Sequence, residues 1–436
     1  NASGVVNYQI TNGSTAFQVW DVTNPIQPAA ILNESTTNDF TFKDVAGSLK
    51  EYVILNDTDF YRPETVANAK VKNQNLHALQ DLNYIVITNS ELSAQAQRLA
   101  DYHQNNSNFT TRVVLLEEIY NEFSSGSPDI TGIRDFIKHL YDSNSSEDKK
   151  LKYVCFFGDA SYDYKDRLQG NNNAVPVKLS TISFNLANSW VTDDFFVMMD
   201  ADEGGMASNH TVDVASSRIP VSTIAEATAV VDKILNYYSK NSIGDWRNTI
   251  TLVTDDIDAA GEEVLEQGVE SIADEIKVNQ PIFNVNKIYT DAYVQENSSG
   301  GERYPEVNKA ITNAIEKGTL VFDYFGHGGE DGFASERILD VPQIQGFNNP
   351  NTLPLLITVT CEFSRFDNPN RITAGELTLK NTNGGAANMI TTTREVFIYV
   401  GQRFNEELIR VLLAFNKEDL TISEALMTTK NNFTSS

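Results

Sequence analysis

From Asp81 onwards, the sequence alternates between short apolar runs and longer amphipathic stretches. Apolar runs of roughly four to eight residues are typical of buried strands, and apolar residues recurring every three to four positions are typical of helices. This alternation indicates right-handed βαβ units, which build a mostly parallel sheet covered by helices. The predicted strands cover 84–88, 112–116, 152–157, 249–254, 285–289, 319–325, 353–360 and part of 386–392, and the predicted helices cover 91–104, 129–141, 224–239, 259–276, 305–317, 401–415 and 421–432.

The alternating region contains two such sets, joined near residues 240–247. Because single cores seldom grow beyond about 250–300 residues, we expect an α/β fold with two consecutive subdomains, residues 76–244 and 245–436. Residues 1–75 have another pattern, in which short alternating runs such as Glu51–Leu55 lie between turn clusters, without a helical stretch. They are predicted to be antiparallel β structure at the end of a β-rich N-terminal domain.

Two reactive side chains follow directly after successive predicted strands. The strand 319–325 leads into Gly326-His327-Gly328-Gly329, and the strand 353–360 ends on Cys361. Ligands of open α/β sheets bind at the loops beyond the carboxyl ends of the strands, so we interpret the two side chains as one site. Cys361 is the predicted nucleophile and His327 its base. A thiol with an ordinary pKa near ~8.5 needs such a base, because the thiolate is the attacking species.

The backbone N–H groups of Gly328 and Cys361 are the predicted oxyanion hole for the carbonyl under attack. Cys361 and His327 each also have a structural interpretation. A single cysteine at a strand end is often a small core residue, and a histidine in a glycine-rich turn often only caps the turn. Their placement on successive strands favours the catalytic pair. The other cysteine, Cys155, lies within a predicted strand and is interpreted as core packing.

The composition excludes several classes of protein. The chain has 33 Lys and Arg against 59 Asp and Glu, a formal net charge of −26. Nucleic acid is therefore excluded as a partner, because phosphates are bound by clustered basic residues, and the acidity is interpreted as a solvated surface. Two cysteines make no disulfide framework. No apolar run reaches the ~18 residues of a transmembrane helix, and no signal peptide opens the chain.

Residues 165–215 form a long irregular insertion with two acidic clusters. Long loops inside an α/β domain are usually functional, so this one is predicted to shape a substrate cleft. Asp193 and Asp194 belong to this loop and could serve the cleft. The alternative interpretation is that they are solvated turn residues, because aspartate favours turns. Asp200, Asp202 and Glu203 have a spacing that suits calcium, but a full calcium-binding loop is missing, so we predict no required cofactor and assign no metal.

Eight motifs along nearly the whole chain resemble the gingipain-type cysteine peptidases, family C25, and within it the sortases of the type IX secretion system of Gram-negative bacteria. They are Asn73–His77, Ile119–Gly126, Phe157–Tyr164, Thr192–Phe195, Tyr324–Glu330, Glu336–Arg337, Thr358–Pro369 and Thr391–Arg394. Departures are Ser216-Ser217, where relatives tend to have a glycine, and Val359, which replaces an alanine. The resemblance implies a caspase-like fold with His327 and Cys361 in the second subdomain. It also implies that Asp193 or Asp194 lines the specificity pocket or orients the catalytic histidine.

What the resemblance implies for function is a cysteine endopeptidase and transpeptidase. Such a sortase removes the C-terminal signal domain of secreted cargo, forms a thioester on Cys361 and transfers the cargo to an amine of anionic lipopolysaccharide. The implied partners are cargo proteins with signal domains, the lipopolysaccharide acceptor, an outer-membrane β-barrel anchor of the PorV type and other attachment-complex subunits. The implied location is the cell surface, peripheral on the outer membrane, with an export signal that this chain lacks, as expected of a mature or internal fragment.

Two other classes of function compete with this one. A catalytically inactive scaffold that binds signal domains has the same fold, and the intact His327 and Cys361 argue against it. A nucleotide-binding α/β protein needs a glycine-rich loop after its first strand, which Thr88-Asn-Ser90 does not provide. The single Gly158-Asp159 pair is interpreted as a strand-end turn, because it matches neither a dinucleotide nor a Walker pattern.

Overall fold

The computed structural model describes residues 4–13, 18–64, 70–185, 188–299, 301–415 and 417–434. The chain forms two compact units, Asn1–Asn73 and Gln74–Ser436. Among its described residues, the first unit contains antiparallel strands, as predicted, and a small core in which Tyr8 stacks on Phe42 with ring centroids 5.0 Å apart. Its strands β1 (Gly4–Ile10) and β4 (Phe40–Ala46) pair with each other, and β2 (Gln18–Asp21) pairs with β3 (Ala29–Ile31) and β5 (Tyr52–Leu55).

The second unit begins with a four-stranded parallel sheet in the order β11-β8-β6-β7. Successive side chains of its strands point to opposite faces. Ile85 and Ile87 pack with α2 and α3, and Val86 packs with α1 and α4. The elements are β6 (Tyr84–Thr88), α1 (Ser93–Asn106), β7 (Thr111–Leu115), α2 (Leu116–Phe123), α3 (Ile130–Asp142), β8 (Tyr153–Phe157), β11 (Ala215–Ile219) and α4 (Ile224–Tyr237).

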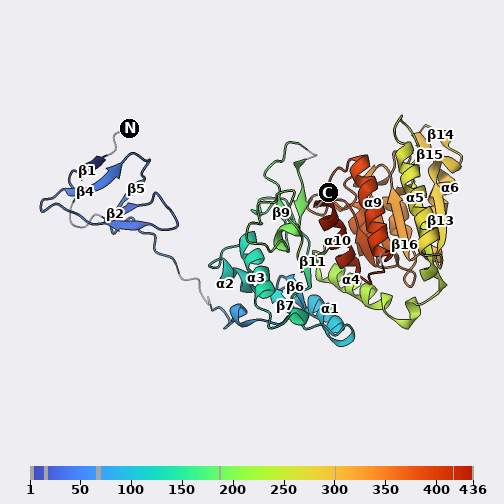
Figure 1. Cartoon of the computed structure of the whole chain (residues 1–436), viewed down its shortest axis with the longest axis horizontal. Coiled ribbons are helices and arrows are strands. Elements are labelled where there is room, and N and C mark those ends of the chain that lie inside the picture. The colour runs from blue at the N-terminus through green and yellow to red at the C-terminus, as the bar shows by residue number, and fades with distance from the viewer. Residues whose placement is uncertain are drawn as a thin grey trace. The chain divides into compact units, whose positions relative to one another are not determined.

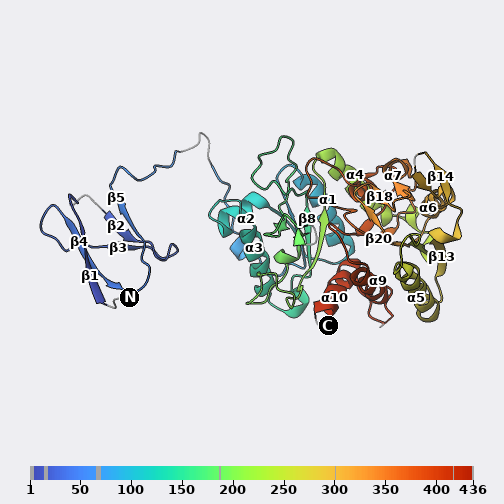
Figure 2. The same cartoon turned by 90° about the horizontal axis from the view of Figure 1, so that it is seen from above.

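A five-stranded parallel sheet in the order β13-β12-β16-β20-β21 follows, beyond residue 244. Helices α5 and α9 cover one face, and α6, α7 and α8 cover the other (Figure 2). Helix α10 (Ile422–Thr434) packs on α9 near the C-terminus. The remaining elements are β12 (Thr249–Thr254), α5 (Glu263–Asn279), β13 (Asn284–Tyr289), α6 (Pro305–Lys317), β16 (Val321–Phe325), α7 (Val341–Gly346), β20 (Leu355–Val359), α8 (Ala374–Lys380), β21 (Asn388–Ile390) and α9 (Ile398–Leu412).

The observed fold is therefore the predicted α/β class with mostly parallel sheets (Figure 1). The predictions missed several short elements, because a run of two to eight residues shows little periodicity: α2, α7 and α8, the strand β11 of the first sheet, the hairpin of β14 (Glu296–Ser298) and β15 (Gly301–Arg303), and the small sheet of β17 (Gly328–Gly329), β18 (Gly332–Phe333) and β19 (Leu339–Asp340). The insertion 165–215 contains the two-residue strands β9 (Lys178–Leu179) and β10 (Val191–Thr192).

Short 3-10 helices connect several of these elements; they are Leu76–Ala78, Glu147–Lys149, Asp194–Phe196, Lys240–Ser242, Asp245–Asn248 and Thr290–Ala292. Within the described parts of the chain, no helix combines the length and the apolar character that crossing a membrane requires.

Candidate active site

His327 and Cys361 follow two neighbouring parallel strands at matching positions. In the register of β16 and β20, Phe325 lies opposite Val359. Each reactive residue is thus the second residue past a paired position, on the same edge of the sheet. Cys361 is partly buried and the His327 side chain is 46% exposed, so the edge is open to a substrate.

Two glycines let the histidine loop lie close to its neighbours. A Cβ atom at Gly326 would be 2.6 Å from the Cβ of Asp255, and one at Gly328 would be 2.6 Å from Oγ1 of Thr360. Both distances are shorter than atoms tolerate, so larger residues would push the loop away. Because Thr360 immediately precedes Cys361, the contact at Gly328 joins the histidine loop to the cysteine loop.

The backbone of His327 is fixed from two sides. Its N–H donates to Oδ2 of Asp255 at 2.9 Å, and its carbonyl accepts the hydroxyl of Tyr324 at 2.6 Å. Asp255 directly follows β12, whose Thr254 lies opposite Phe325. Three adjacent strands, β12, β16 and β20, therefore each supply a polar residue to this edge.

The imidazole of His327 is held by Glu262, the residue before helix α5. Its Nε2 lies 3.1 Å from Oε1 of Glu262, and the other carboxylate oxygen accepts the N–H groups of Asp258 and Ala259, both at 2.9 Å. Burial raises the pKa of Glu262, but these hydrogen bonds outweigh it and lower the pKa below its usual value. An ionised carboxylate only accepts, so Nε2 carries the proton and Nδ1 has the lone pair of a base.

The cysteine loop is held by its neighbours at several points. Glu362, immediately after Cys361, has a φ of 51°, an uncommon conformation for a residue with a side chain. Its N–H donates to the carbonyl of Arg394 at 3.3 Å. The Arg394 guanidinium binds both oxygens of the fully buried Asp367, at 2.8 and 2.7 Å. This bidentate pair ties the motifs Thr358–Pro369 and Thr391–Arg394 together.

The predicted oxyanion donor Gly328 has a suitable backbone position. It lies opposite Phe333 in the β17–β18 pair, and the N–H of Ala334 donates to the carbonyl of His327 at 2.9 Å. That bond makes Gly328 and Phe333 a non-hydrogen-bonded pair, so the pair leaves the N–H of Gly328 unused. The role of the Gly328 and Cys361 N–H groups as an oxyanion hole remains a prediction.

The comparison with protein-family models matches residues 77–436 to peptidase family C25. The chain belongs to peptidase family C25. Its fold is similar to the Arg-specific cysteine proteinase gingipain R (RgpB), at 17% identity and a TM-score of 0.61, over 82% of this chain and 73% of that chain. Dimeric latent PorU from Porphyromonas gingivalis matches at 27% identity and a TM-score of 0.47, over 56% of this chain and 24% of that chain. No curated protein matches.

In this C25 chain, the partners of Asp193 and Asp194 are Arg218 and Lys430 and not His327, which argues against the alternative that one of the two aspartates orients this histidine. Arg218 donates to both oxygens of Asp193 at 2.8 and 2.7 Å, and Lys430 lies 2.7 Å from Asp194. Both aspartates line a cavity of about 490 Å³ that reaches the cysteine loop at Ser364. Their charges are already paired, however, so neither provides the free carboxylate expected of a pocket for a basic side chain.

The other acidic cluster of the insertion is held together internally. Glu203 accepts the N–H groups of Asp200 and Thr211, both at 2.9 Å. In the described parts of the chain, Asp200, Asp202 and Glu203 do not form a group of converging carboxylates. The structure adds nothing in favour of a calcium site there.

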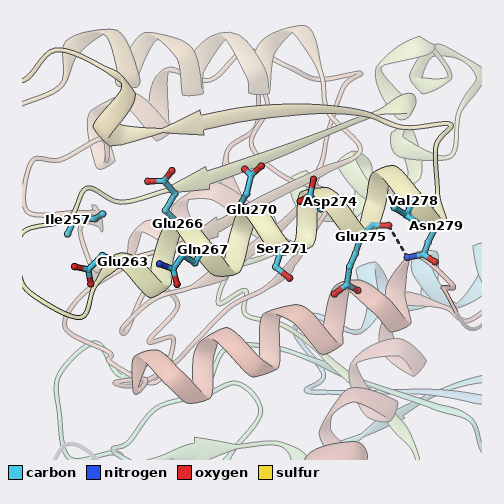
Figure 3. Close-up of a pocket in the computed structure, with 10 residues that line it drawn as sticks. All are labelled: Ile257, Glu263, Glu266, Gln267, Glu270, Ser271, Asp274, Glu275, Val278 and Asn279. Carbon is cyan, nitrogen blue, oxygen red and sulfur yellow. Dashed lines mark hydrogen bonds between the residues drawn. The ribbon is translucent and has the colours of Figure 1, made fainter.

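A hollow of about 800 Å³ on the outside of α5 is lined by neither His327 nor Cys361. Figure 3 shows that, apart from Ile257, its lining side chains come from this single helix. Glu270 lies 2.6 Å from Lys287, and Glu275 lies 2.6 Å from Arg410. These carboxylates form a solvated, ion-paired surface, which is the interpretation the composition suggested.

Sequence reasoning missed two residues that hold His327. Asp255 had a usable signal, because it follows a predicted strand just as His327 and Cys361 do. Glu262 had none, since it reaches the imidazole through the loop between β12 and α5, and the path of that loop is not encoded in any local pattern.

Proposed function

We propose that this protein is a cysteine endopeptidase and transpeptidase that acts as a sortase of the type IX secretion system. It would remove the C-terminal signal domain from secreted cargo and transfer the cargo to anionic lipopolysaccharide at the cell surface. The placement of His327 and Cys361 two residues past paired positions of β16 and β20 carries the peptidase chemistry. The transfer and its partners rest on the resemblance of the sequence motifs to the PorU type of sortase.

The first half of the reaction forms an acyl-enzyme. Nδ1 of His327 takes the proton of the Cys361 thiol, and the thiolate attacks the carbonyl carbon of the scissile peptide bond. The oxyanion receives hydrogen bonds from the N–H groups of Gly328 and Cys361. When the intermediate collapses, the C–N bond breaks, the imidazolium gives its proton to the leaving amine of the signal domain, and a thioester remains on Cys361.

The second half of the reaction resolves the thioester. An amine of lipopolysaccharide attacks the thioester carbonyl, His327 takes the proton that the amine loses, and Cys361 leaves and regains a proton. Water in place of the amine gives hydrolysis through the same acyl-enzyme. Glu262 keeps the imidazole in the orientation and tautomer that both halves need.

The test is a reaction of the purified protein with signal-domain cargo and lipopolysaccharide, followed by mass spectrometry of the new cargo C-terminus. A mass that includes the amine acceptor supports transpeptidation, and a free carboxylate shows a hydrolase. Cargo that stays bound and uncut, with Cys361 unreactive toward an alkylating probe, would establish the inactive scaffold instead. Cys361→Ala is the negative control.

A further inference from the structure

A groove of about 670 Å³ is lined by the catalytic histidine and by the segment that follows it. Its lining begins in the chain with His327 and ends with Pro342, so it takes in β17, β18 and the turn between β18 and β19. Cys361 does not line it. The groove therefore lies on the side of the base rather than on the side of the nucleophile.

The side of the base is where amines leave and enter in the proposed reaction. His327 gives a proton to the leaving amine and takes one from the attacking amine, so both come within reach of the imidazole. The leaving amine is held by the signal domain of which it is part. A free acceptor has to be bound before it can compete with water for the thioester. This step rests on the proposed transpeptidase function.

The acidic side chains that line the groove already have partners within the chain. Glu330 and Asp331 both form ion pairs with Arg371. Asp340 accepts the N–H of Gln343 at 3.0 Å and thereby caps helix α7. These carboxylates are therefore engaged in holding the walls of the groove.

Arg337 has no such partner. Among the described residues that line the groove, it is the one lysine or arginine. It is exposed, and in the parts of the chain that the structure describes no carboxylate lies within ion-pair distance of its guanidinium. The groove therefore offers one unpaired positive charge on the side where the acceptor enters.

The backbone of Arg337 is held in an uncommon conformation. Its φ is 58°, a value that residues with a side chain rarely adopt. Its N–H donates to the carbonyl of Ala334 at 3.3 Å, and its carbonyl accepts Nδ2 of Asn308 at 2.8 Å. Such conformations persist where the surrounding structure holds them, and they cluster at sites that bind ligands. Helix α6, which carries Asn308, thus fixes the turn that presents the guanidinium.

We propose that Arg337 binds an anionic group, a phosphate or a carboxylate, of the acceptor whose amine resolves the thioester. A guanidinium matches either group with two parallel hydrogen bonds. The net charge of −26 makes the chain repel anions, so an anionic acceptor needs a positive group beside the site. The amine nitrogen bonds to the thioester carbonyl carbon, the C–S bond breaks, and the amine proton passes through His327 to the sulfur of Cys361.

The test uses pairs of small acceptors that differ in one anionic group. Phosphoethanolamine is compared with ethanolamine for a phosphate, and glycine with glycinamide for a carboxylate. The proteins are wild type, Arg337→Gln, Arg337→Lys and the matched control Arg98→Gln, at a position of α1 whose side chain is 41% exposed. Release of the signal domain gives the acylation rate, and mass spectrometry gives the amounts of amide and free carboxylate. Each amine is compared across the variants, so its intrinsic reactivity cancels.

Arg337→Gln should lower the amide formed with the anionic acceptor of at least one pair by about tenfold, with the neutral acceptor and the acylation rate unchanged. Arg337→Lys should restore part of the loss, and the control should behave as wild type. An equal loss with charged and neutral acceptors would make Arg337 a structural residue. Slower acylation with unchanged transfer would assign it to the leaving segment. Either result would overturn the proposal.

Binding is also measured without turnover, in Cys361→Ala. Phenylglyoxal modifies exposed arginines, and an anionic acceptor should slow the modification of Arg337 more than its neutral counterpart does, with no difference at Arg98. Modification of Arg337 at the same rate with every acceptor would contradict the anion site. If Arg337 is protected but wild type makes only the free carboxylate, the transpeptidase function fails and the anion site does not, so the two failures are distinguishable.

Discussion

The two parallel sheets of the second unit share an architecture but differ at their carboxyl edges. Beyond the first sheet, the buried Lys380 forms ion pairs with two buried carboxylates, those of Asp159 and Glu376. Beyond the second sheet, Asp255 and Asp256 are buried without such a lysine among the described residues, and His327 is left half exposed. The first edge is thus closed by its own side chains, while the second keeps reactive groups accessible.

The two cysteines repeat this contrast at the level of one residue type. Cys155 lies within β8 and is 1% exposed, and burial raises its pKa to about 11. Cys361 lies two residues past the last paired residue of β20 and is partly exposed. The position relative to the strand end, rather than the residue type, separates the core thiol from the partly exposed one.

The largest expected effect comes from replacing each of the two cysteines with alanine, one at a time. Cys361→Ala should abolish cargo processing with the fold intact, because the covalent step is lost and little packing is removed. Cys155→Ala should keep activity and lose at most a few kcal/mol of unfolding free energy, since it leaves a small cavity. Processing rates, urea unfolding and mass spectrometry after alkylation measure both. If Cys155 were alkylated faster than Cys361, the assignment of Cys361 as the reactive thiol and of Cys155 as the core thiol would be wrong.

Next in size is the loss of the base. His327→Ala should lower the acylation rate by ~10²–10⁴-fold, because proton transfer from the thiol and to the leaving amine is lost. The variant should also need a higher pH for alkylation of Cys361. The control variant is His103→Ala. His103 is a half-buried histidine of α1, a helix that packs on the first sheet, and its replacement should leave the acylation rate unchanged. If the pH dependence of Cys361 alkylation were the same in His327→Ala as in wild type, the two side chains would not act as a catalytic pair.

A smaller effect distinguishes carboxylates that serve the histidine from those that serve the fold. Glu262→Gln should lower kcat about tenfold with little change in Tm, since it weakens the orientation of His327. Asp193→Asn should instead cost stability, about 3–5 kcal/mol, because it leaves the buried Arg218 poorly paired. Measuring kcat and Tm for both variants tests this. A drop in kcat for Asp193→Asn at unchanged Tm would restore the orienting role to Asp193.

The smallest expected effect on activity concerns Asp323 in the middle of β16, where the change is one of stability. Burial raises its pKa to about 7, although Asn405 donates a hydrogen bond at 3.0 Å that lowers it. The folded state thus keeps a proton that the unfolded state has lost above about pH 4, so wild-type stability falls as pH rises towards 7. Asp323→Asn should remove this loss, a gain of a few kcal/mol at pH 8 and less at pH 5.

Chemical denaturation of wild type and Asp323→Asn between pH 5 and 8 measures the difference. The gap between the two should widen with pH up to about 7 and then stay constant. A gap that does not depend on pH would mean that Asp323 is ionised in the folded state at pH 5.

Much of this protein follows from its sequence, because the deciding patterns are local. The strands 249–254 and the helix 305–317 coincide with β12 and α6, since period and capping act within a few residues. His327 and Cys361 were found as candidates for the same reason, as each follows directly on an apolar strand. Membership of the C25 family is likewise carried by contiguous motifs.

Other features were decided only by the tertiary structure, because they join segments with no local relation. The pairs Glu262–His327, Asp193–Arg218 and Asp367–Arg394 depend on strand order and loop paths. The convergence of Asp255 and Asp256 on Glu336 joins residues that are some 80 positions apart in the sequence. Ion pairs form between side chains that are close in space, and these side chains are often far apart in the sequence. Only the folded structure therefore shows which charged groups are paired.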